Sequence, residues 1–355
     1  MIARAARTLG RAGVGLALVT VLAAWAGDPR PAATPSPVAP VATPDTRAAD
    51  MGVAEWLMRM HEAPRKRAYI GTFVVSTGAA MSSARIWHSC DGVQQMQRVE
   101  PLSGPPRSTI RRDDQVVTFL PDAKVAVIEK RESLGLFPEL LKSTSLPIAQ
   151  YYSARRTGSE RVAGQESDVV LLQPKDDLRY GYRVWSEKKT GLVVKLQTLD
   201  HDGRVLEQAA FSELQLDAPV SQAKLGQMMD NLDGYRVERP QIIRTTAATE
   251  GWALRAPVAG FAPMNCFLRP ATAADGSVAD PTMQWVFSDG LASVSVFIEP
   301  FDRRRHVVEG FTSSGATQTL TRRLTDKAGD WSLTLVGEVP RQTLNAFASA
   351  LERRK

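Results

Sequence analysis

Between Tyr69 and Leu214 the chain alternates short runs of apolar residues with turn residues, a pattern that predicts a β-rich domain. Two tight hairpins are predicted, one at Ser89-Cys90-Asp91-Gly92, where Asp-Gly supplies the positive φ, and one at Pro121-Asp122. Short strands joined by such turns form an antiparallel meander. The predicted strands are 71–75, 84–88, 93–99, 116–120, 125–128, 169–172, 180–185, 192–199 and 205–214.

Apolar residues recur at helical spacing in segments before, between and after the predicted strands. Val53, Trp56, Leu57 and Met60 would form one face of a helix that Asp50 caps and Pro64 ends. Shorter helical pieces are expected at 136–141 and 224–229. Near the end of the chain, Pro340 suits the first turn of a closing helix with Leu344, Phe347 and Leu351 on one face.

These patterns divide the chain into five parts. Residues 51–216 form a first domain, 217–250 a linker region, and 251–355 a smaller second domain of α+β class with strands at 284–287, 291–298, 317–324 and 331–336. Residues 1–26, with Arg4, Arg7, Arg11 and a short apolar run, are typical of a cleavable signal peptide. The alternative, an uncleaved anchor, is disfavoured because spanning needs roughly 20 apolar residues. Residues 27–50, rich in Pro and Ala, form a tether.

No arrangement of residues indicates a catalytic or metal site. The four histidines lack partners at metal-ligand spacing, and no P-loop or nucleophile elbow is present. Ser221-Gln222-Ala223-Lys224 and Lys189-Thr190-Gly191 match two β-lactamase motifs, but they occur in the wrong order and without the third. The acid pairs Asp113-Asp114 and Asp176-Asp177 are interpreted as solvated loop residues. The sequence therefore predicts a protein that is not an enzyme and has no cofactor or metal.

Charge adds one candidate surface. The net charge is +6, but residues 1–26 carry three Arg and no acid, so the remaining chain is +3, which does not favour nucleic-acid binding. Basic residues are concentrated near the end of the chain. They form either a solvated face or a docking surface for an acidic segment or phosphorylated headgroup, and both interpretations stay open. The candidate partner-binding residues are Arg303, Arg304, Arg305, Arg322 and Arg323.

The first domain holds many large apolar residues for one sheet, among them Phe73, Ile86 and Phe119. They belong either to a filled core or to the lining of a lipid cavity in an incompletely closed barrel. The sequence does not separate these two interpretations. Cys90 and Cys266 lie far apart along the chain, and we expect no bridge between them.

Several blocks of sequence resemble the RseB/MucB family. In the first domain they are Gly71-Thr72-Phe73-Val74, Arg179-Tyr180-Gly181-Tyr182-Arg183-Val184-Trp185, Thr190-Gly191-Leu192 and Asp202-Gly203-Arg204-Val205-Leu206-Glu207-Gln208. In the second they are Phe287-Ser288-Asp289-Gly290-Leu291-Ala292, Val296-Phe297-Ile298-Glu299, Gly315-Ala316-Thr317 and Val336-Gly337-Glu338-Val339-Pro340. The blocks occur in order over nearly the whole chain after residue 53. The Pro/Ala tether and the cysteines match no family pattern.

The resemblance implies a periplasmic regulator of an envelope-stress sigma factor. Such a protein binds the periplasmic part of a membrane anti-sigma factor of RseA/MucA type and protects it from proteolysis. Lipopolysaccharide or lipoprotein acyl chains would trigger release. The resemblance also implies an unclosed antiparallel β-barrel like that of lipoprotein carriers, with covering helices, followed by a smaller partner-binding domain. The protein would be peripheral to the inner membrane through its partner, either as a monomer or as a homo-oligomer. The alternative is a lipid or lipoprotein carrier without a sigma-factor role.

Overall fold

The computed structural model describes residues 51–130, 147–272, 278–303, 305–306, 309–327 and 329–354. All of them belong to one unit that runs from Asp45 to Lys355. The predicted signal peptide, the tether and the helical piece at 136–141 lie outside the described residues.

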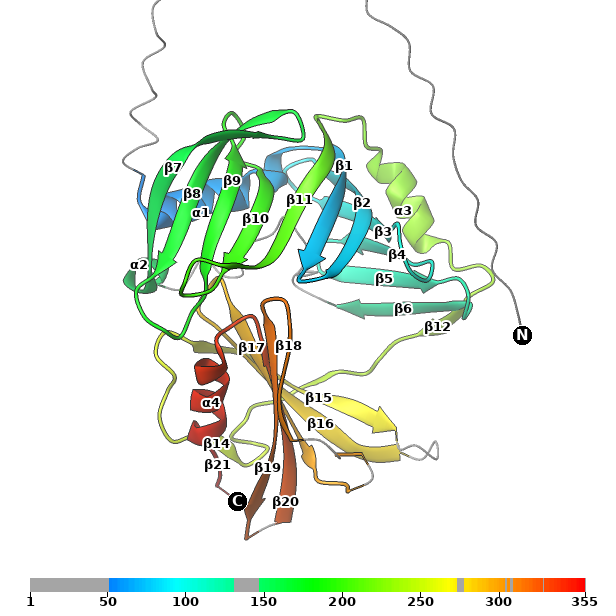
Figure 1. The fold of residues 1–355 in the computed structure, drawn as a ribbon. Helices are drawn as coiled ribbons and strands as arrows, with labels where there is room; N and C mark the ends of the chain where they lie inside the picture. The colour runs from blue at the N-terminus through cyan, green and yellow to red at the C-terminus, as the bar shows by residue number, and fades with distance from the viewer. Residues whose placement is uncertain are drawn as a thin grey trace, which may run out of the picture. The chain divides into compact units, whose positions relative to one another are not determined.

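The first domain is built on one twelve-stranded sheet in the order β12-β6-β5-β4-β3-β2-β1-β11-β10-β9-β8-β7 (Figure 1). Neighbouring strands are antiparallel except β12 and β6, which are parallel. Two meanders, β1–β6 and β7–β11, are joined where β1 pairs with β11, and β12 and β7 end the order, so the sheet is unclosed as predicted. The strands are β1 (Tyr69–Thr77), β2 (Ala80–Cys90), β3 (Gln95–Pro101), β4 (Ser108–Arg112), β5 (Gln115–Leu120), β6 (Val125–Lys130), β7 (Tyr152–Val162), β8 (Gln165–Pro174), β9 (Gly181–Glu187), β10 (Val193–Leu199), β11 (Val205–Leu216) and β12 (Arg236–Glu238).

Helices cover this sheet at two places and define two apolar clusters. Helix α1 (Val53–Glu62), continued by a 3₁₀ turn (Pro64–Lys66), buries the predicted face of Val53, Trp56, Leu57 and Met60 against strands of both meanders. Gly52, not the predicted Asp50, occupies its N-cap position. Helix α3 (Gln222–Asp230), capped by Ser221, buries Leu225 and Met229 over β3–β6. The short α2 (Ile148–Tyr151) precedes β7.

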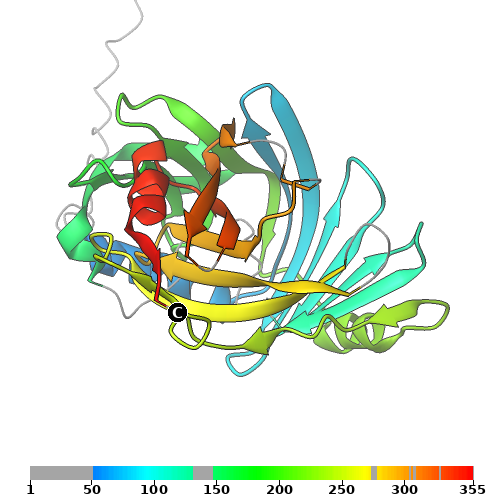
Figure 2. The ribbon, with the colours of Figure 1, turned by 90° about the horizontal axis from the view of Figure 1, so that it is seen from below.

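The second domain contains a seven-stranded sheet in the order β13-β15-β16-β17-β20-β19-β18, antiparallel throughout. Helix α4 (Arg341–Ala350) packs on one face of this sheet (Figure 2). The ring centre of Phe347 on this helix lies 4.7 Å from that of Phe287. Leu351 begins a strand that pairs with β14 beside this core. The strands are β13 (Ile243–Arg244), β14 (Trp252–Leu254), β15 (Ala262–Thr272), β16 (Val278–Ser288), β17 (Ser293–Pro300), β18 (Gly310–Ser314), β19 (Thr317–Asp326), β20 (Gly329–Gly337) and β21 (Leu351–Arg353).

The prediction missed strands whose residues are polar or interrupted by proline. β4 and β7 carry mostly polar side chains, and β7 ends the sheet order with one side of its backbone unpaired within this sheet. β15 contains Pro263 and Pro270, which mask a strand pattern. The region 217–250 contains the predicted helix, but it also supplies β12 and β13, which extend one sheet each.

The pairing of β1 with β11 leaves no room for a side chain at Gly71. A Cβ atom there would lie 2.6 Å from Cε1 of Phe211 and 2.9 Å from the carbonyl oxygen of Glu213. This pairing joins the two meanders, so the close approach of β1 and β11 at Gly71 is needed to keep the sheet continuous.

We therefore expect Gly71→Ala to lower the free energy of unfolding by about 1–3 kcal/mol, as overpacking does in other cores. Gly226→Ala in α3 is the matched control, since its Cβ would approach only Nη2 of Arg112, at 3.1 Å, and alanine favours helix. Urea unfolding followed by circular dichroism measures both. Equal stability of the two variants would contradict the packing argument.

Candidate functional site: a buried polar network

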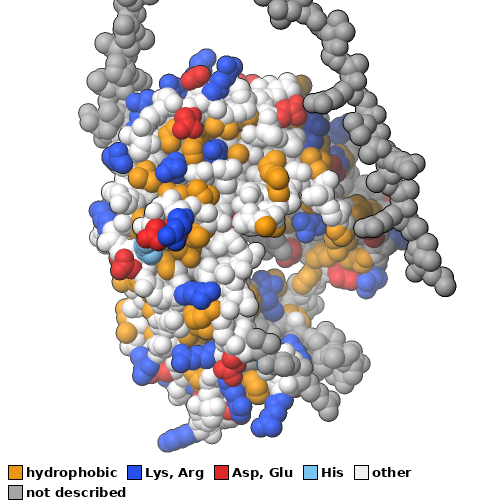
Figure 3. Space-filling model, viewed as in Figure 1, with side chains coloured by type: hydrophobic (Ala, Val, Ile, Leu, Met, Phe, Trp, Pro, Cys, Tyr) orange, Lys and Arg blue, Asp and Glu red, His pale blue; other side chains and the backbone are white. Residues whose placement is uncertain are grey.

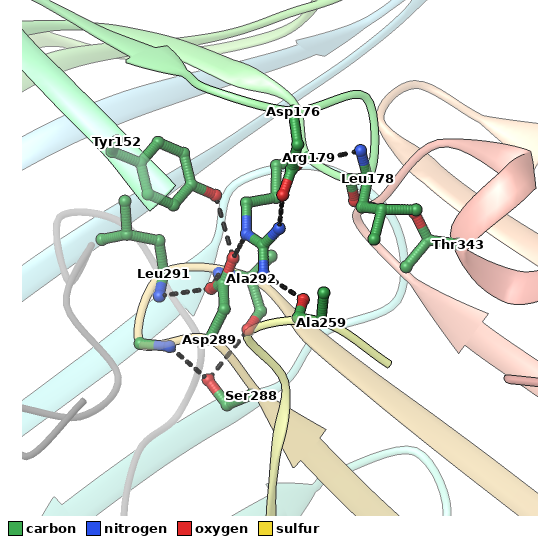
Figure 4. A network of polar contacts seen from close by, with 11 residues as sticks. Tyr152, Asp176, Leu178, Arg179, Ala259, Ser288, Asp289, Leu291, Ala292 and Thr343 are labelled. Atoms are coloured by element: carbon green, nitrogen blue, oxygen red, sulfur yellow. Dashed lines mark hydrogen bonds and ion pairs between the residues drawn. The ribbon is translucent and has the colours of Figure 1, made fainter. Parts of the chain in front are cut away.

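Two of the sequence blocks described above meet in one buried network, although they are far apart in the chain (Figure 4). Arg179 lies in the loop between β8 and β9, and Asp289 lies in the turn between β16 and β17. Nε of Arg179 donates to Oδ2 of Asp289 at 2.8 Å, and both side chains are fully buried. The hydroxyl of Tyr152, on β7, donates to the same carboxylate oxygen at 3.0 Å.

Hydrogen bonds within its own turn hold the Asp289 carboxylate. The backbone N–H groups of Leu291 and Ala292 donate to Oδ1 at 2.9 and 2.7 Å. Oγ of Ser288 donates to the Ala292 carbonyl and accepts from the N–H of Gly290, whose φ of 102° suits glycine. The local turn thus occupies Oδ1 and leaves Oδ2 for Tyr152 and Arg179.

The guanidinium of Arg179 is held on every side. Nη1 pairs with Asp176, and Nη2 donates to the Ala259 carbonyl at 2.6 Å. Its Cζ lies 4.3 Å from the ring centre of Tyr151 and 4.8 Å from that of Phe261. The next residue, Gly260, has a φ of 79°, and a Cβ atom there would lie 2.0 Å from Nη2 of Arg179, so only glycine fits.

Helix α4 contacts the same loop. Oγ1 of Thr343, which is fully buried, donates to the Leu178 carbonyl at 2.7 Å, and the Gln342 side chain donates to the Asp177 carbonyl. The loop between β8 and β9 is therefore fixed to the second sheet through α4 as well as through Asp289.

Both charges of the Arg179–Asp289 pair are compensated by hydrogen bonds, which a buried ion pair requires to be stable.

Burial raises the pKa of the Tyr152 hydroxyl well above its ordinary value, and burial likewise raises the pKa of the Tyr182 hydroxyl. A protonated Tyr152 donates to the carboxylate, so the network holds two sheets together. Within the described part of the chain, no group of three or more His, Cys, Asp or Glu side chains could hold a metal ion.

Of the candidate basic residues, Arg322 and Arg323 lie on β19, and Arg303 and Arg305 lie in the segment between β17 and β18. Arg323 pairs with Asp330 and stacks 4.4 Å from the ring centre of Phe301, while Arg305 pairs with Glu299 at 3.1 Å. Arg303 and Arg322 are exposed, and Arg304 lies outside the described residues. Successive side chains of a strand point to opposite faces, which places Arg322 on the face opposite to Arg323. On the face drawn in Figure 3, basic and acidic side chains are interspersed.

The candidate lipid-binding residues are all buried but belong to two clusters. Phe73 and Ile86 lie in the core under α1, which includes Trp56. Phe119 lies under α3, with its ring centre 5.2 Å from that of Tyr235. The structure brings the first two together and separates them from the third, and lipid binding by these residues stays a prediction.

Sequence reasoning did not single out Arg179, Asp289 or Tyr152 as site residues. It also interpreted Asp176 as a solvated loop acid; Asp176 does lie in a loop and is partly exposed, but it pairs with the buried Arg179. The available signal was a charged residue next to a predicted core segment, since Arg179 immediately precedes the predicted strand at 180–185. No local sequence pattern pointed to its partner Asp289, which lies 110 residues further along the chain.

An open sheet tied to a second, smaller sheet by a buried ion pair defines a two-domain protein. The sequence profile of the MucB/RseB N-terminal domain matches residues 52–229, and that of the MucB/RseB C-terminal domain matches residues 246–352. The chain belongs to the MucB/RseB family.

Relatives of known name span nearly the whole chain. The Sigma factor AlgU regulatory protein MucB of Pseudomonas aeruginosa is 29% identical over 319 residues, covering 88% of this chain and 93% of that protein. The Sigma-E factor regulatory protein RseB of Salmonella typhimurium is 25% identical over 312 residues, covering 86% and 92%. A chain in the solved Pseudomonas aeruginosa MucA/MucB complex is 27% identical with a TM-score of 0.66, covering 85% of this chain and 99% of that one.

We expect Arg179→Met to lower the free energy of unfolding by about 3–5 kcal/mol, because it leaves the Asp289 carboxylate buried without its counterion. Asp289→Asn should also destabilise, but the double variant should lose less than the sum of the two, since neither charge is then left alone. Urea unfolding of all four proteins gives the coupling energy. The control Arg204→Met breaks an exposed pair with Asp202 and should cost at most about 1 kcal/mol. Strictly additive losses would show that the two residues act independently.

Stability should also fall in alkali. In the unfolded chain Tyr152 and Tyr182 ionise near pH 10, whereas in the fold their raised pKa values keep them protonated. Their contribution is complete below about pH 10 and is lost as the pH rises further, by roughly 1.4 kcal/mol per pH unit for each tyrosine. In urea unfolding from about pH 8 to 11.5, Tyr152→Phe should show a shallower loss than the wild type. An unchanged slope would refute this assignment.

Proposed function

We propose that this protein regulates an envelope-stress sigma factor by binding the periplasmic part of an anti-sigma factor of MucA/RseA type. The observation that carries the proposal is the match of both domains, in order, to the MucB/RseB family. The likeness to a chain of the MucA/MucB complex over 85% of this chain supports it.

The protein acts in this proposal by binding and not by catalysis. It shields the anti-sigma factor from regulated proteolysis in the periplasm, to which residues 1–26 direct it as a cleavable signal peptide. It stays peripheral to the inner membrane through its partner. Binding of lipid or lipopolysaccharide triggers release, with the interior of the first domain around Phe73 and Ile86 as the site of an acyl chain. Because both residues pack under α1, an entering chain must displace part of that packing.

The second domain, residues 251–355, supplies the partner-binding surface in this proposal. Arg305 and Arg323 already pair with Glu299 and Asp330, so much of their charge is compensated within the fold. Arg303 and Arg322 are exposed. Neither forms an ion pair with a residue that the structure describes, although the charge of Arg303 helps to lower the pKa of the Asp330 carboxyl. They are therefore the residues of the basic group best placed to contact an acidic segment.

We expect the double variant Arg303→Glu/Arg322→Glu to bind the periplasmic segment of Pseudomonas aeruginosa MucA at least about tenfold more weakly at low salt, with the difference shrinking as salt rises. Titration calorimetry at several salt concentrations measures this. The control Arg204→Glu changes an equally exposed arginine in the hairpin between β10 and β11 and should bind normally. If the double variant binds as the wild type at every salt concentration, these arginines form only a solvated face. If the wild type itself does not bind MucA, the proposed function needs another partner.

A further inference from the structure

An apolar pocket opens in the second domain, and one of its walls, Phe261, also stacks on Arg179 of the polar network. Its volume is about 560 Å³, within the range of sites for small molecules. None of its lining residues is charged, and the aromatic walls are Trp252, Phe261, Trp285 and Phe287.

The polar groups of this pocket are neutral and few. Burial raises the pKa of the Cys266 thiol to about 11, so the thiol is uncharged at neutral pH and adds to the apolar wall. Trp285 and Phe287 lie with ring centres 4.6 Å apart and form a rigid aromatic surface. Met264 is partly exposed at the wall, although it is a large apolar side chain. A pocket of this lining favours a hydrocarbon guest.

A basic groove of about 670 Å³ adjoins the pocket and shares Asn265 with it. Four basic residues line the groove, Lys130, Arg239, Arg244 and Arg269, against the two acids Asp114 and Glu129. Nη2 of Arg244 donates to Oδ1 of Asn265 at 2.6 Å, which places this exposed guanidinium at the boundary of the two hollows. One bond uses one of the five N–H groups of an arginine. Among the described residues, no carboxylate pairs with Arg244.

We propose that the pocket and the groove together bind an anionic single-chain amphiphile, with the hydrocarbon chain in the pocket and the acidic headgroup on Arg244. The apolar lining selects the chain, and the local basic excess selects the negative head. This site is separate from the interior of the first domain and from the surface of Arg303 and Arg322, and it does not depend on the proposed partner.

Photo-crosslinking of the full mature chain with a palmitic acid that carries a diazirine near its chain end tests the location. Mass spectrometry then identifies the labelled peptides. We expect label on residues between Thr245 and Cys266 or on Trp285 and Phe287. Label confined to the first domain, or no label at all, overturns the proposal.

Titration calorimetry of defined variants tests the two parts of the site. Arg244→Glu should weaken palmitate binding at this site about tenfold, because the charged hydrogen bonds to the head are lost. The same change should leave binding of the uncharged hexadecanol unaltered. Ala248→Trp, at an exposed position in the wall, should fill the pocket and abolish both the binding and the label.

Matched controls separate the site from general effects. Arg354→Glu reverses an exposed arginine of the same domain, and Ser349→Trp adds an indole on α4 outside the pocket; both should bind palmitate normally. Inorganic phosphate alone should not bind measurably, since it lacks the chain. Equal loss in Arg244→Glu and Arg354→Glu would show only nonspecific attraction and would overturn the proposal. Tight binding of phosphate without palmitate would overturn it too, because the groove would then be an anion site unconnected with the pocket.

Discussion

A buried ion pair between Arg179 and Asp289 is the constraint on which the connection of the two sheets depends. Taking a guanidinium and a carboxylate out of water is unfavourable unless every remaining donor and acceptor is used. The protein meets this requirement with groups from four separate elements: the turn of Asp289 itself, Tyr152 on β7, Asp176 in the β8–β9 loop and the Ala259 carbonyl before β15. Each of these elements supplies a hydrogen bond that the buried charges need.

This requirement extends to residues that carry no charge. Gly260 is needed because any Cβ atom would occupy the place of Nη2 of Arg179, and Tyr151 and Phe261 stack on the guanidinium faces. Thr343 ties α4 to the same loop. In the proposed function the second domain recognises a partner and the first responds to a ligand, so the two domains need a defined connection. The network supplies such a connection.

Local signals in the sequence predicted much of the fold. The turn Asp91-Gly92 forms as expected, with Asp91 accepting from the backbone of Val93 and Gln94, and the face of α1 is the predicted one. The antiparallel meander and the closing helix follow from the same kind of pattern. β7 was missed because it ends the sheet order and its side chains are mostly polar. The partnership of Arg179 with Asp289 was out of reach because it spans 110 residues, and only the folded topology brings them together.

Counting charges along the chain also fails to distinguish the roles that arginines take here. Arg179 is buried, and each of its three guanidinium nitrogens forms a hydrogen bond within the fold. Arg305 and Arg323 are adjacent to other basic residues in sequence, yet Glu299 and Asp330 from β17 and β20 compensate them across the sheet. Arg244, which belongs to no basic run, stands exposed beside an apolar pocket. A run of basic residues in a sequence can therefore mean two things. The residues can pair with acidic residues of the same fold, or they can bind an external anion. The folded contacts decide between the two.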